Sequence, residues 1–295
     1  MKKFIISIAV LLPLFSCSMF KLDNYEGPNA EVTGKLLDVV TGEMVSLEAA
    51  MSQTFSWTTW SMVTTIDYGA IVVYEQGYVP PTWGGDPAEY DGKDSGQDWL
   101  VRFDGQFTNT MVFAGTYKFS TQKKLPCYDP EEGKDTFVLK EGKNHMDIGV
   151  MPFCRIKDPK IEVVGKKLVA TFYVELGDPS RANKITNVAF CGNTQLFVGC
   201  NNMNLAKDDP GAKAKNVNPG ELITLEINMD KTDPSFKNAD LFKYESQDRY
   251  FRIAAMAEGN GYNSEKNKYY NFSPIYKISA DFSKIEEVQW DTVQW

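Results

Sequence analysis

The 295-residue chain contains a single histidine, His145, and this scarcity excludes several kinds of catalytic site. A Ser-His-Asp or Cys-His arrangement would have to use His145, and no nucleophile-elbow motif accompanies it. We interpret His145 as a strand-end or linker histidine. The sequence also has no C-x-x-C pair, no P-loop and no dinucleotide-binding fingerprint. We therefore predict no catalytic residue, no metal site and no cofactor.

These absences leave glycoside hydrolysis open, because that reaction needs only two carboxylates about 5–10 Å apart in a cleft. The chain has 39 acidic residues. β-Sandwiches of this size without long insertions seldom enclose such a cleft, so hydrolysis is the less favoured alternative. The most acidic loop, Asp86–Asp98, does not follow the EF-hand order, since Lys93 takes the third position when counting starts at Asp91. A solvated loop is the favoured interpretation.

No hydrophobic run reaches the roughly 20 residues that a membrane-spanning helix needs. The run Phe4–Phe15 has twelve residues and follows two lysines, a pattern typical of a signal peptide. It ends in Leu-Phe-Ser-Cys, which resembles a bacterial lipobox, with Phe15 departing from the general pattern. We predict that residues 1–16 are removed and that Cys17 carries acyl chains. The alternative is an ordinary secretory peptide.

The lipobox resemblance predicts an address at the outer membrane. Residues 17–27 would form a short lipidated tether. Export to the cell surface is often marked by acidic residues after the lipidated cysteine, and here they arrive at Asp23 and Glu26. We therefore favour the cell surface over the periplasmic face.

Basic residues are fewer than acidic ones, 31 against 39. The formal net charge is −8, and loss of residues 1–16 with their two lysines brings it to −10. No basic patch offsets this acidity, so we predict no nucleic-acid partner and no electrostatic binding to anionic membranes.

The cysteines other than Cys17 are few and follow no metal-ligand spacing: Cys127, Cys154, Cys191 and Cys200. Four cysteines allow three sets of pairings that the sequence does not rank. A tight turn at Gly192-Asn193 would place Cys191 opposite Thr194, well short of Cys200. We expect free or partly buried thiols.

Short alternating strands dominate the rest of the chain and predict an all-β fold of two β-sandwich domains in tandem, at 28–150 and 151–280, followed by a tail at 281–295. Trp99, Val101 and Phe103 share one face of a strand, as do Tyr117 and Phe119 further on. The stretches 167–176 and 222–228 alternate in the same way. In 249–257, we expect alternate apolar residues from position 251 to face inward.

Two stretches in the first half resemble a known domain. VTGKLLDVVTG followed by DGQFTNTMVFAGTYKF is similar to the carboxypeptidase-regulatory or transthyretin-like β-sandwich. The stretch 249–278 resembles strands of an immunoglobulin or fibronectin type III module, with Arg249 where that module carries a core tyrosine.

The combination of these domains behind a lipoprotein signal resembles an uncharacterised two-domain lipoprotein family from Bacteroidetes. Its members are typically encoded beside receptor pairs of the starch-utilisation type. The resemblance therefore implies a part in glycan capture or import at the outer membrane, with the receptor pair and an oligosaccharide as partners.

The candidate sugar-binding residues are aromatic side chains in loop-like sequence: Trp57, Trp60, Tyr78 and Trp83. Flat rings on a rigid sandwich are a common platform for sugars. Trp83 is the best candidate, because it follows Pro80-Pro81 and precedes Gly84-Gly85 on a predicted exposed turn. The alternative is that these rings fill the core.

Three hypotheses follow. The favoured one is a lipid-anchored, non-enzymatic accessory of a glycan-uptake system. The second is a structural or adhesive spacer that binds a protein partner, and the third is a glycoside hydrolase.

Overall fold

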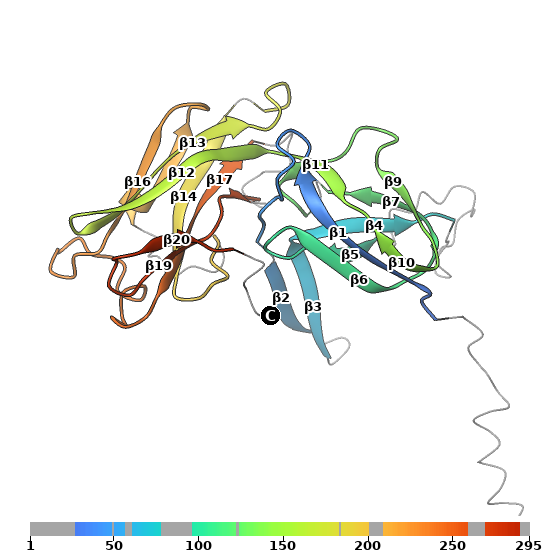
Figure 1. Cartoon of the computed structure of the whole chain (residues 1–295), viewed down its shortest axis with the longest axis horizontal. Helices are drawn as coiled ribbons and strands as arrows, with labels where there is room; N and C mark the ends of the chain where they lie inside the picture. Colours follow the sequence, from blue (N-terminus) through green and yellow to red (C-terminus); the bar gives the residue numbers. More distant parts are fainter. Residues whose placement is uncertain are drawn as a thin grey trace, which may run out of the picture.

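The computed structural model describes residues 27–48, 50–56, 61–77, 96–121, 124–182, 184–200, 209–258 and 269–289. Nearly all regular structure in these ranges is β-strand, which confirms the predicted all-β fold class. The strands form two groups in Figure 1, and each group encloses a hydrophobic core. We call strands β1–β11 the N-terminal unit and strands β12–β20 the C-terminal unit. No described helix is long and apolar enough to cross a membrane.

The N-terminal unit packs two main sheets, with strand orders β10-β1-β11-β8 and β5-β4-β7-β9, and a separate β2–β3 hairpin. Its strands are β1 (Ala30–Asp38), β2 (Ala50–Ser56), β3 (Ser61–Tyr68), β4 (Ala70–Glu75), β5 (Gln97–Leu100), β6 (Gln106–Val112), β7 (Gly115–Ser120), β8 (Cys127–Tyr128), β9 (Thr136–Leu139), β10 (Gly142–His145) and β11 (Ile148–Pro152).

Strand β1 is the centre of its sheet. On one edge of β1, the first half of the strand pairs in parallel with β10 and the second half pairs in parallel with β11. On the opposite edge, β6 pairs antiparallel with the first part of β1. Val32 and Leu36 are fully buried, as the period of two requires. Trp99 and Tyr117 lie in the same core with ring centroids 6.0 Å apart, which confirms both as core residues.

Two turns of this unit contain a glycine with a positive φ angle. Gly42 adopts φ +72° and donates its N–H to Asp38 O in the turn after β1, and Gly105 adopts φ +81° between β5 and β6. A side chain at Gly105 would also lie 2.7 Å from the carbonyl oxygen of Val45. Only glycine therefore fits this turn without strain.

The C-terminal unit packs a sheet of order β12-β13-β16 against one of order β15-β14-β17-β19-β20, with β18 beside β17. Its elements are β12 (Cys154–Val164), β13 (Lys167–Leu176), β14 (Ile185–Asn193), the 3₁₀ helix η3 (Pro210–Ala212), β15 (Lys213–Val217), β16 (Ile223–Asn228), β17 (Arg249–Ala257), β18 (Asn271–Phe272), β19 (Tyr276–Ile278) and β20 (Ile285–Glu287).

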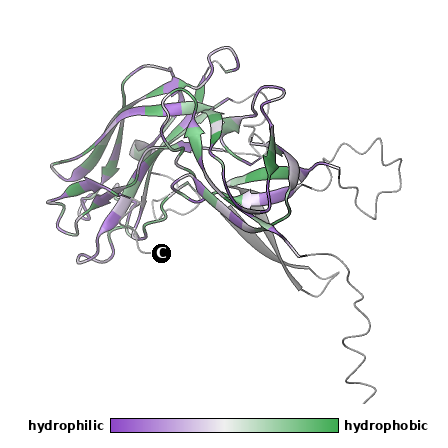
Figure 2. Cartoon of the chain, turned by 45° about the vertical axis from the view of Figure 1, so that its right-hand side comes forward, coloured by the Kyte–Doolittle hydropathy of each residue, from purple (hydrophilic) through white to green (hydrophobic). Residues whose placement is uncertain are grey.

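The predicted alternation holds in β13 and β16, whose inward positions are buried: Leu168, Ala170, Phe172, Val174, Ile223, Leu225 and Ile227. Figure 2 shows hydrophobic positions on the strands of both units and hydrophilic positions at many turns. Strand β20 pairs with β19, so this part of the predicted tail belongs to the sheet, whereas residues 290–295 lie outside the described ranges.

Strand β17 is buried on both faces rather than on one. Phe251, Ile253 and Ala255 face the main core as predicted, but Arg252 and Ala254 are buried as well. The second face of β17 is covered because it packs on a small apolar cluster that includes Val198 and Ile275, beside the N-terminal unit. Both faces of this strand are therefore internal.

Arg249 is buried in the C-terminal core, where the resemblance leads one to expect tyrosine. Its guanidinium group donates to the carbonyl oxygens of Leu241 and Tyr244 at 3.0 and 2.7 Å. It also lies 5.1 Å from the ring centroids of Phe242 and Phe282. These carbonyls and rings replace the water that the cation loses.

The two cores meet around Tyr128. This residue lies on β8 of the N-terminal unit, yet its ring packs edge-on against Phe153 at 4.7 Å and belongs to the second core. The predicted domain boundary at residues 150 and 151 stays a prediction.

Candidate functional site

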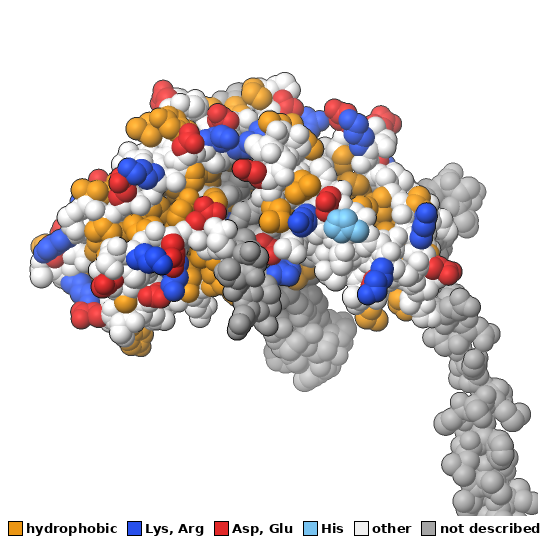
Figure 3. All heavy atoms as spheres, viewed as in Figure 1, with side chains coloured by type: hydrophobic (Ala, Val, Ile, Leu, Met, Phe, Trp, Pro, Cys, Tyr) orange, Lys and Arg blue, Asp and Glu red, His pale blue; other side chains and the backbone are white. Residues whose placement is uncertain are grey.

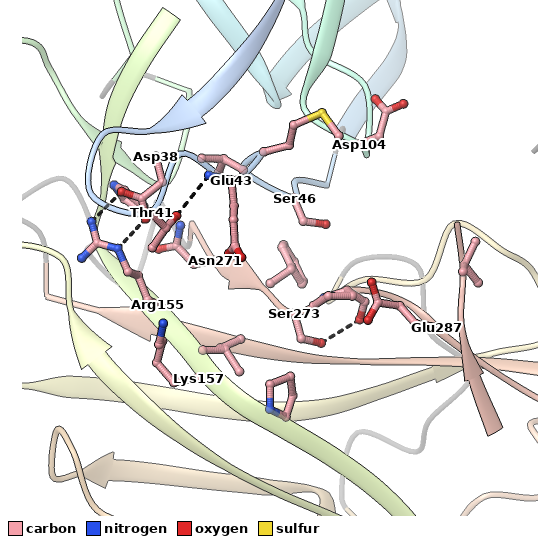
Figure 4. A pocket seen from close by; sticks show the side chains of 18 of the residues that line it. Asp38, Thr41, Glu43, Ser46, Asp104, Arg155, Lys157, Asn271, Ser273 and Glu287 are labelled. Carbon is pink, nitrogen blue, oxygen red and sulfur yellow. Dashed lines mark hydrogen bonds and ion pairs between the residues drawn. The ribbon is translucent and has the colours of Figure 1, made fainter. Parts of the chain in front are cut away.

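A groove of about 800 Å³ lies where the two units meet. The N-terminal unit contributes residues between 41 and 46, after β1, and Asp104 beside β6. The C-terminal unit contributes residues 155–159 of β12 and the segments 271–276 and 287–289. Figure 4 shows side chains from both units pointing into this space.

An ion pair between Asp38 and Arg155 joins the units at one wall of the groove. Arg155 Nη2 donates to Asp38 Oδ1 at 2.7 Å, and Arg155 Nε bonds the other carboxylate oxygen. Burial alone would raise the pKa of Asp38, but hydrogen bonds from Arg155 and from the backbone N–H of Val40 outweigh burial and lower it. The hydrogen bonds that Arg155 donates to Asp38 also raise the pKa of Arg155, so both groups are charged at neutral pH.

Arg252 of β17 joins the units more deeply. Its side chain is fully buried, with the guanidinium carbon 3.9 Å from the Phe272 ring centroid. Nη1 donates to Leu47 O at 3.0 Å, and Nη2 donates to Ser46 Oγ at 2.7 Å and to Ser273 O at 3.2 Å. Burial lowers the pKa of Arg252 to about 10, so the group still carries its charge at neutral pH. Ser46 and Ser273 both line the groove.

Two further contacts cross the junction. Asn271 Nδ2 donates to Pro126 O at 3.1 Å, and its Oδ1 accepts the backbone N–H of Cys154 at 3.1 Å. Glu48 is buried and accepts the backbone N–H of Cys200 at 3.1 Å. The walls of the groove are therefore held by buried polar contacts, as in a largely pre-formed ligand site.

Several groove side chains are free to meet a ligand. No hydrogen bond or ion pair within the described ranges uses the side chains of Lys35, Lys157 or Glu43. Tyr276 stands among them, and its hydroxyl donates to Pro159 O at 3.4 Å. Burial raises the pKa of Tyr276 to about 12, so it is a neutral donor at physiological pH. The groove thus offers acids, bases and hydroxyls together.

The predicted sugar-binding residues, Trp57, Trp60, Tyr78 and Trp83, lie outside the described residues. Strand β2 ends at Ser56 and β3 begins at Ser61, with these two residues paired. The role of the four aromatic residues stays a prediction.

His145 lies on open strand surface. Its Nε2 is 3.3 Å from Asp147 Oδ1, and its Nδ1 is 3.4 Å from Thr33 Oγ1. The histidine side chain is 65% exposed, and Figure 3 shows it on the surface of the N-terminal unit. This exposed contact encloses no substrate and, unlike the groove, offers no concave site.

The acidic loop is only partly described. Residues 86–95 lie outside the described ranges, and Asp98 pairs with Lys124 at 2.6 Å. Within the described ranges, no cluster of three histidine, cysteine, aspartate or glutamate side chains is placed to hold a metal ion.

In this structure none of the four cysteines after Cys17 forms a disulfide bond. The predicted distance of Cys191 from Cys200 is wrong, because their Sγ atoms are 3.6 Å apart. The chain does not make a tight turn at Gly192-Asn193. It continues through a loop over residues 194–200, which returns to the end of β14.

Comparison with known proteins gives matches among solved structures. No family model matches the chain, and no curated protein matches it. A proposed carbohydrate-binding protein from Bacteroides uniformis has 28% identity and a TM-score of 0.63, over 86% of this chain and 100% of that one. DUF3823 family proteins from Bacteroides ovatus and Parabacteroides merdae have 19% and 17% identity and TM-scores of 0.54 and 0.57, each over 85% of this chain and 99% of theirs.

The chain has the fold of DUF3823 family proteins. The predicted likeness to an uncharacterised Bacteroidetes family is confirmed at this level. Lipid anchoring and the link to a receptor pair stay predictions.

The residues that build the groove were not found from the sequence. One available indication was the pair of arginines in the apolar strand RYFRIAAMA, since a charge in such a strand needs a buried partner. Arg249 was noticed there, but Arg252, which reaches the other unit, was not.

Proposed function

We propose that the protein is a non-enzymatic carbohydrate-binding protein, anchored at the outer membrane through acyl chains on Cys17. In this proposal it helps a surface system of the starch-utilisation type to capture and import glycans. The Bacteroides uniformis protein, itself a proposed carbohydrate-binding protein, supports the class of ligand.

The observation that carries the proposal is the groove between the units. Its volume of about 800 Å³ falls within the range of roughly 300–1,000 Å³ usual for small-molecule sites. Buried contacts through Arg252 and Arg155 hold its walls, so binding would cost little reorganisation.

The free side chains favour a neutral oligosaccharide. Lys35 and Lys157 stand with Glu43, Asp158 and Glu287 around one space, so a polyanion would meet carboxylates and a polycation would meet amines. Sugar hydroxyls both donate and accept hydrogen bonds and can satisfy both kinds of group. Figure 3 shows acidic and basic side chains mixed over this face of both units.

Two observations favour binding over hydrolysis. The two buried carboxylates at the groove wall are both paired, Asp38 with Arg155 and Asp104 with Arg102. The pKa of Asp38 is lowered, the opposite of what a general acid needs. None of the structural neighbours described above is named as an enzyme.

The predicted aromatic platform remains part of the proposal. Trp83, with Tyr78, Trp57 and Trp60, would stack on the apolar faces of sugar rings while groove side chains bind hydroxyls. The two parts are separable, because groove and aromatic variants can be made independently.

The test is calorimetry and affinity-gel electrophoresis of the full chain in detergent against neutral, acidic and amino glycans. Lys157→Ala removes a free groove side chain, and Lys160→Ala is its matched control, because Lys160 lies on the same strand in a surface pair with Glu162. We expect a neutral glycan to bind, Lys157→Ala and Trp83→Ala each to weaken binding about tenfold, and Lys160→Ala to leave it unchanged. A folded protein that binds no glycan would overturn the proposal.

The extensive contacts across the junction favour a second candidate, a rigid spacer that binds a protein partner. This candidate predicts no glycan binding and co-purification with an outer-membrane receptor after cross-linking in cells.

A further inference from the structure

The thiols of Cys191 and Cys200 lie against each other at the junction of the two units. Their Sγ atoms are 3.6 Å apart, a van der Waals contact between unbonded sulfurs. A disulfide bond needs about 2.05 Å. The remaining distance is about 1.5 Å, and Cys200 lies outside any strand, in the connection that follows β14.

The two cysteines belong to different parts of the C-terminal unit. Cys191 is fully buried on β14, directly opposite Arg252 of the central strand β17. Cys200 lies in the connection that follows β14, whose described residues 194–200 contact the N-terminal unit. In this loop Phe197 packs on Phe103 with ring centroids 4.9 Å apart, and Cys200 donates its N–H to Glu48.

We propose that Cys191 and Cys200 form a disulfide bond in the exported protein, while Cys127 and Cys154 stay as thiols. The bond would fasten this loop to the sheet beside Arg252, whose Nη1 also donates to Val198 O of the loop at 3.3 Å. The junction with the N-terminal unit would then be fixed covalently on one side.

The other two cysteines have no such partner. Cys154 Sγ lies 3.5 Å from Ala255 O and 3.6 Å from Asn271 Oδ1, within a polar contact of its own. Cys127 is fully buried, and no hydrogen bond joins its Sγ to that of Cys154 among the described residues. The structure therefore selects one pairing of those that the sequence leaves open.

The oxidation is a thiol–disulfide exchange with a disulfide oxidant, such as a periplasmic dithiol oxidase or glutathione disulfide. The two thiols lose two protons and two electrons and form one S–S bond, and the oxidant's disulfide is reduced to two thiols. Burial raises the pKa of the Cys200 thiol, so little thiolate exists once the loop has packed. The bond would form during folding, before the loop closes.

Trypsin separates the possible products cleanly. Cys191 and Cys200 fall on one peptide, residues 185–207, whereas Cys127 and Cys154 fall on two others, 125–134 and 144–155. The full chain is unfolded, refolded in a glutathione redox buffer, alkylated under denaturing conditions and digested. We expect peptide 185–207 to be unalkylated and about 2 Da lighter than its dithiol form, with the other two peptides alkylated.

The variants provide the control. Cys127→Ser should leave the internal bond intact, and Cys200→Ser should leave Cys191 alkylated. The main test is the digest of the wild-type chain, so its result does not depend on whether a variant folds. Full alkylation of peptide 185–207, or a bond that links peptides 125–134 and 144–155, would overturn the proposal.

Discussion

Arg155 and Asp38 lie 117 positions apart in the chain, yet the Arg155 guanidinium holds both carboxylate oxygens of Asp38. The two side chains are only 11% and 7% exposed. The contact ties the end of β1 to the start of β12, so it joins the units where the groove begins.

Replacing Asp38 should destabilise the folded chain. Asp38→Asn keeps an oxygen that can accept the Val40 N–H but leaves the Arg155 charge without its partner. We expect a loss of about 3 kcal/mol in the free energy of unfolding. Urea denaturation at pH 7 measures it.

The matched control is Lys160→Ala, which removes an ion pair with Glu162 between side chains that are 64% and 52% exposed. It should change the free energy of unfolding by less than about 0.5 kcal/mol. Equal effects of the two substitutions would show that the Asp38 contact contributes no more than a surface pair.

The difference in stability between the wild type and Asp38→Asn should disappear at low pH. The pKa of Asp38 in the folded chain lies below its ordinary value of 3.8, so the ion pair stabilises fully above that value and loses its effect as pH falls through the folded pKa. Urea midpoints should differ equally at pH 7 and about pH 5, and the difference should shrink below pH 3.8 and vanish once the pH is below the folded pKa. A difference that persists unchanged at about pH 3 would contradict the assignment of this ion pair.

Arg252→Met should loosen the junction. The substitution leaves Leu47 O, Val198 O and Ser273 O without their donor, and we expect a loss of about 3–5 kcal/mol in the free energy of unfolding. Amide hydrogen exchange should accelerate at residues 45–48, which lie in the other unit. Arg252→Lys should rescue little, because one ammonium group cannot serve all of these acceptors.

Arg249→Met is the control that distinguishes a loosened junction from a general loss of stability. Arg249 lies on the same strand and is equally buried, but it bonds only carbonyls of the C-terminal unit. It should destabilise the chain without selective exchange at residues 45–48. The same exchange pattern in both variants would mean that Arg252 has no special role at the junction.

Gly105→Ala should lower the free energy of unfolding by more than a positive φ angle alone explains. The alanine would have to adopt φ +81°, and its Cβ would lie 2.7 Å from Val45 O. We expect a loss of about 3 kcal/mol, against about 1 kcal/mol for Gly133→Ala, where φ is +83° and nothing lies within 4 Å. Thermal unfolding of the two variants makes the comparison, and equal losses would show that the turn moves aside.

The strands could be predicted because their cause is local. Leu168, Phe172 and Val174 alternate with polar neighbours, and a period of two allows one buried face. The same reasoning placed Trp99 and Tyr117 in the core. It covered only half of β17, because the second face of that strand is buried by residues distant in the chain.

The groove could not be predicted, because each of its contacts joins segments far apart in sequence. Arg252 reaches Leu47 across 205 positions, and no local pattern at either residue indicates the other. The position of Cys200 was also beyond local reasoning. Gly192-Asn193 predicts a tight turn that leaves Cys200 away from Cys191, whereas the chain forms a longer loop that returns the second sulfur to the first.

Strand β1 follows directly on the segment that leads from the N-terminus, and it lies in the middle of its sheet between β6 on one side and β10 and β11 on the other. A pull on the chain ahead of Ala30 would act along the strand, at right angles to these hydrogen bonds. They would then bear the load together in shear rather than opening one after another. The fold therefore gives the N-terminal end of the protein high mechanical resistance.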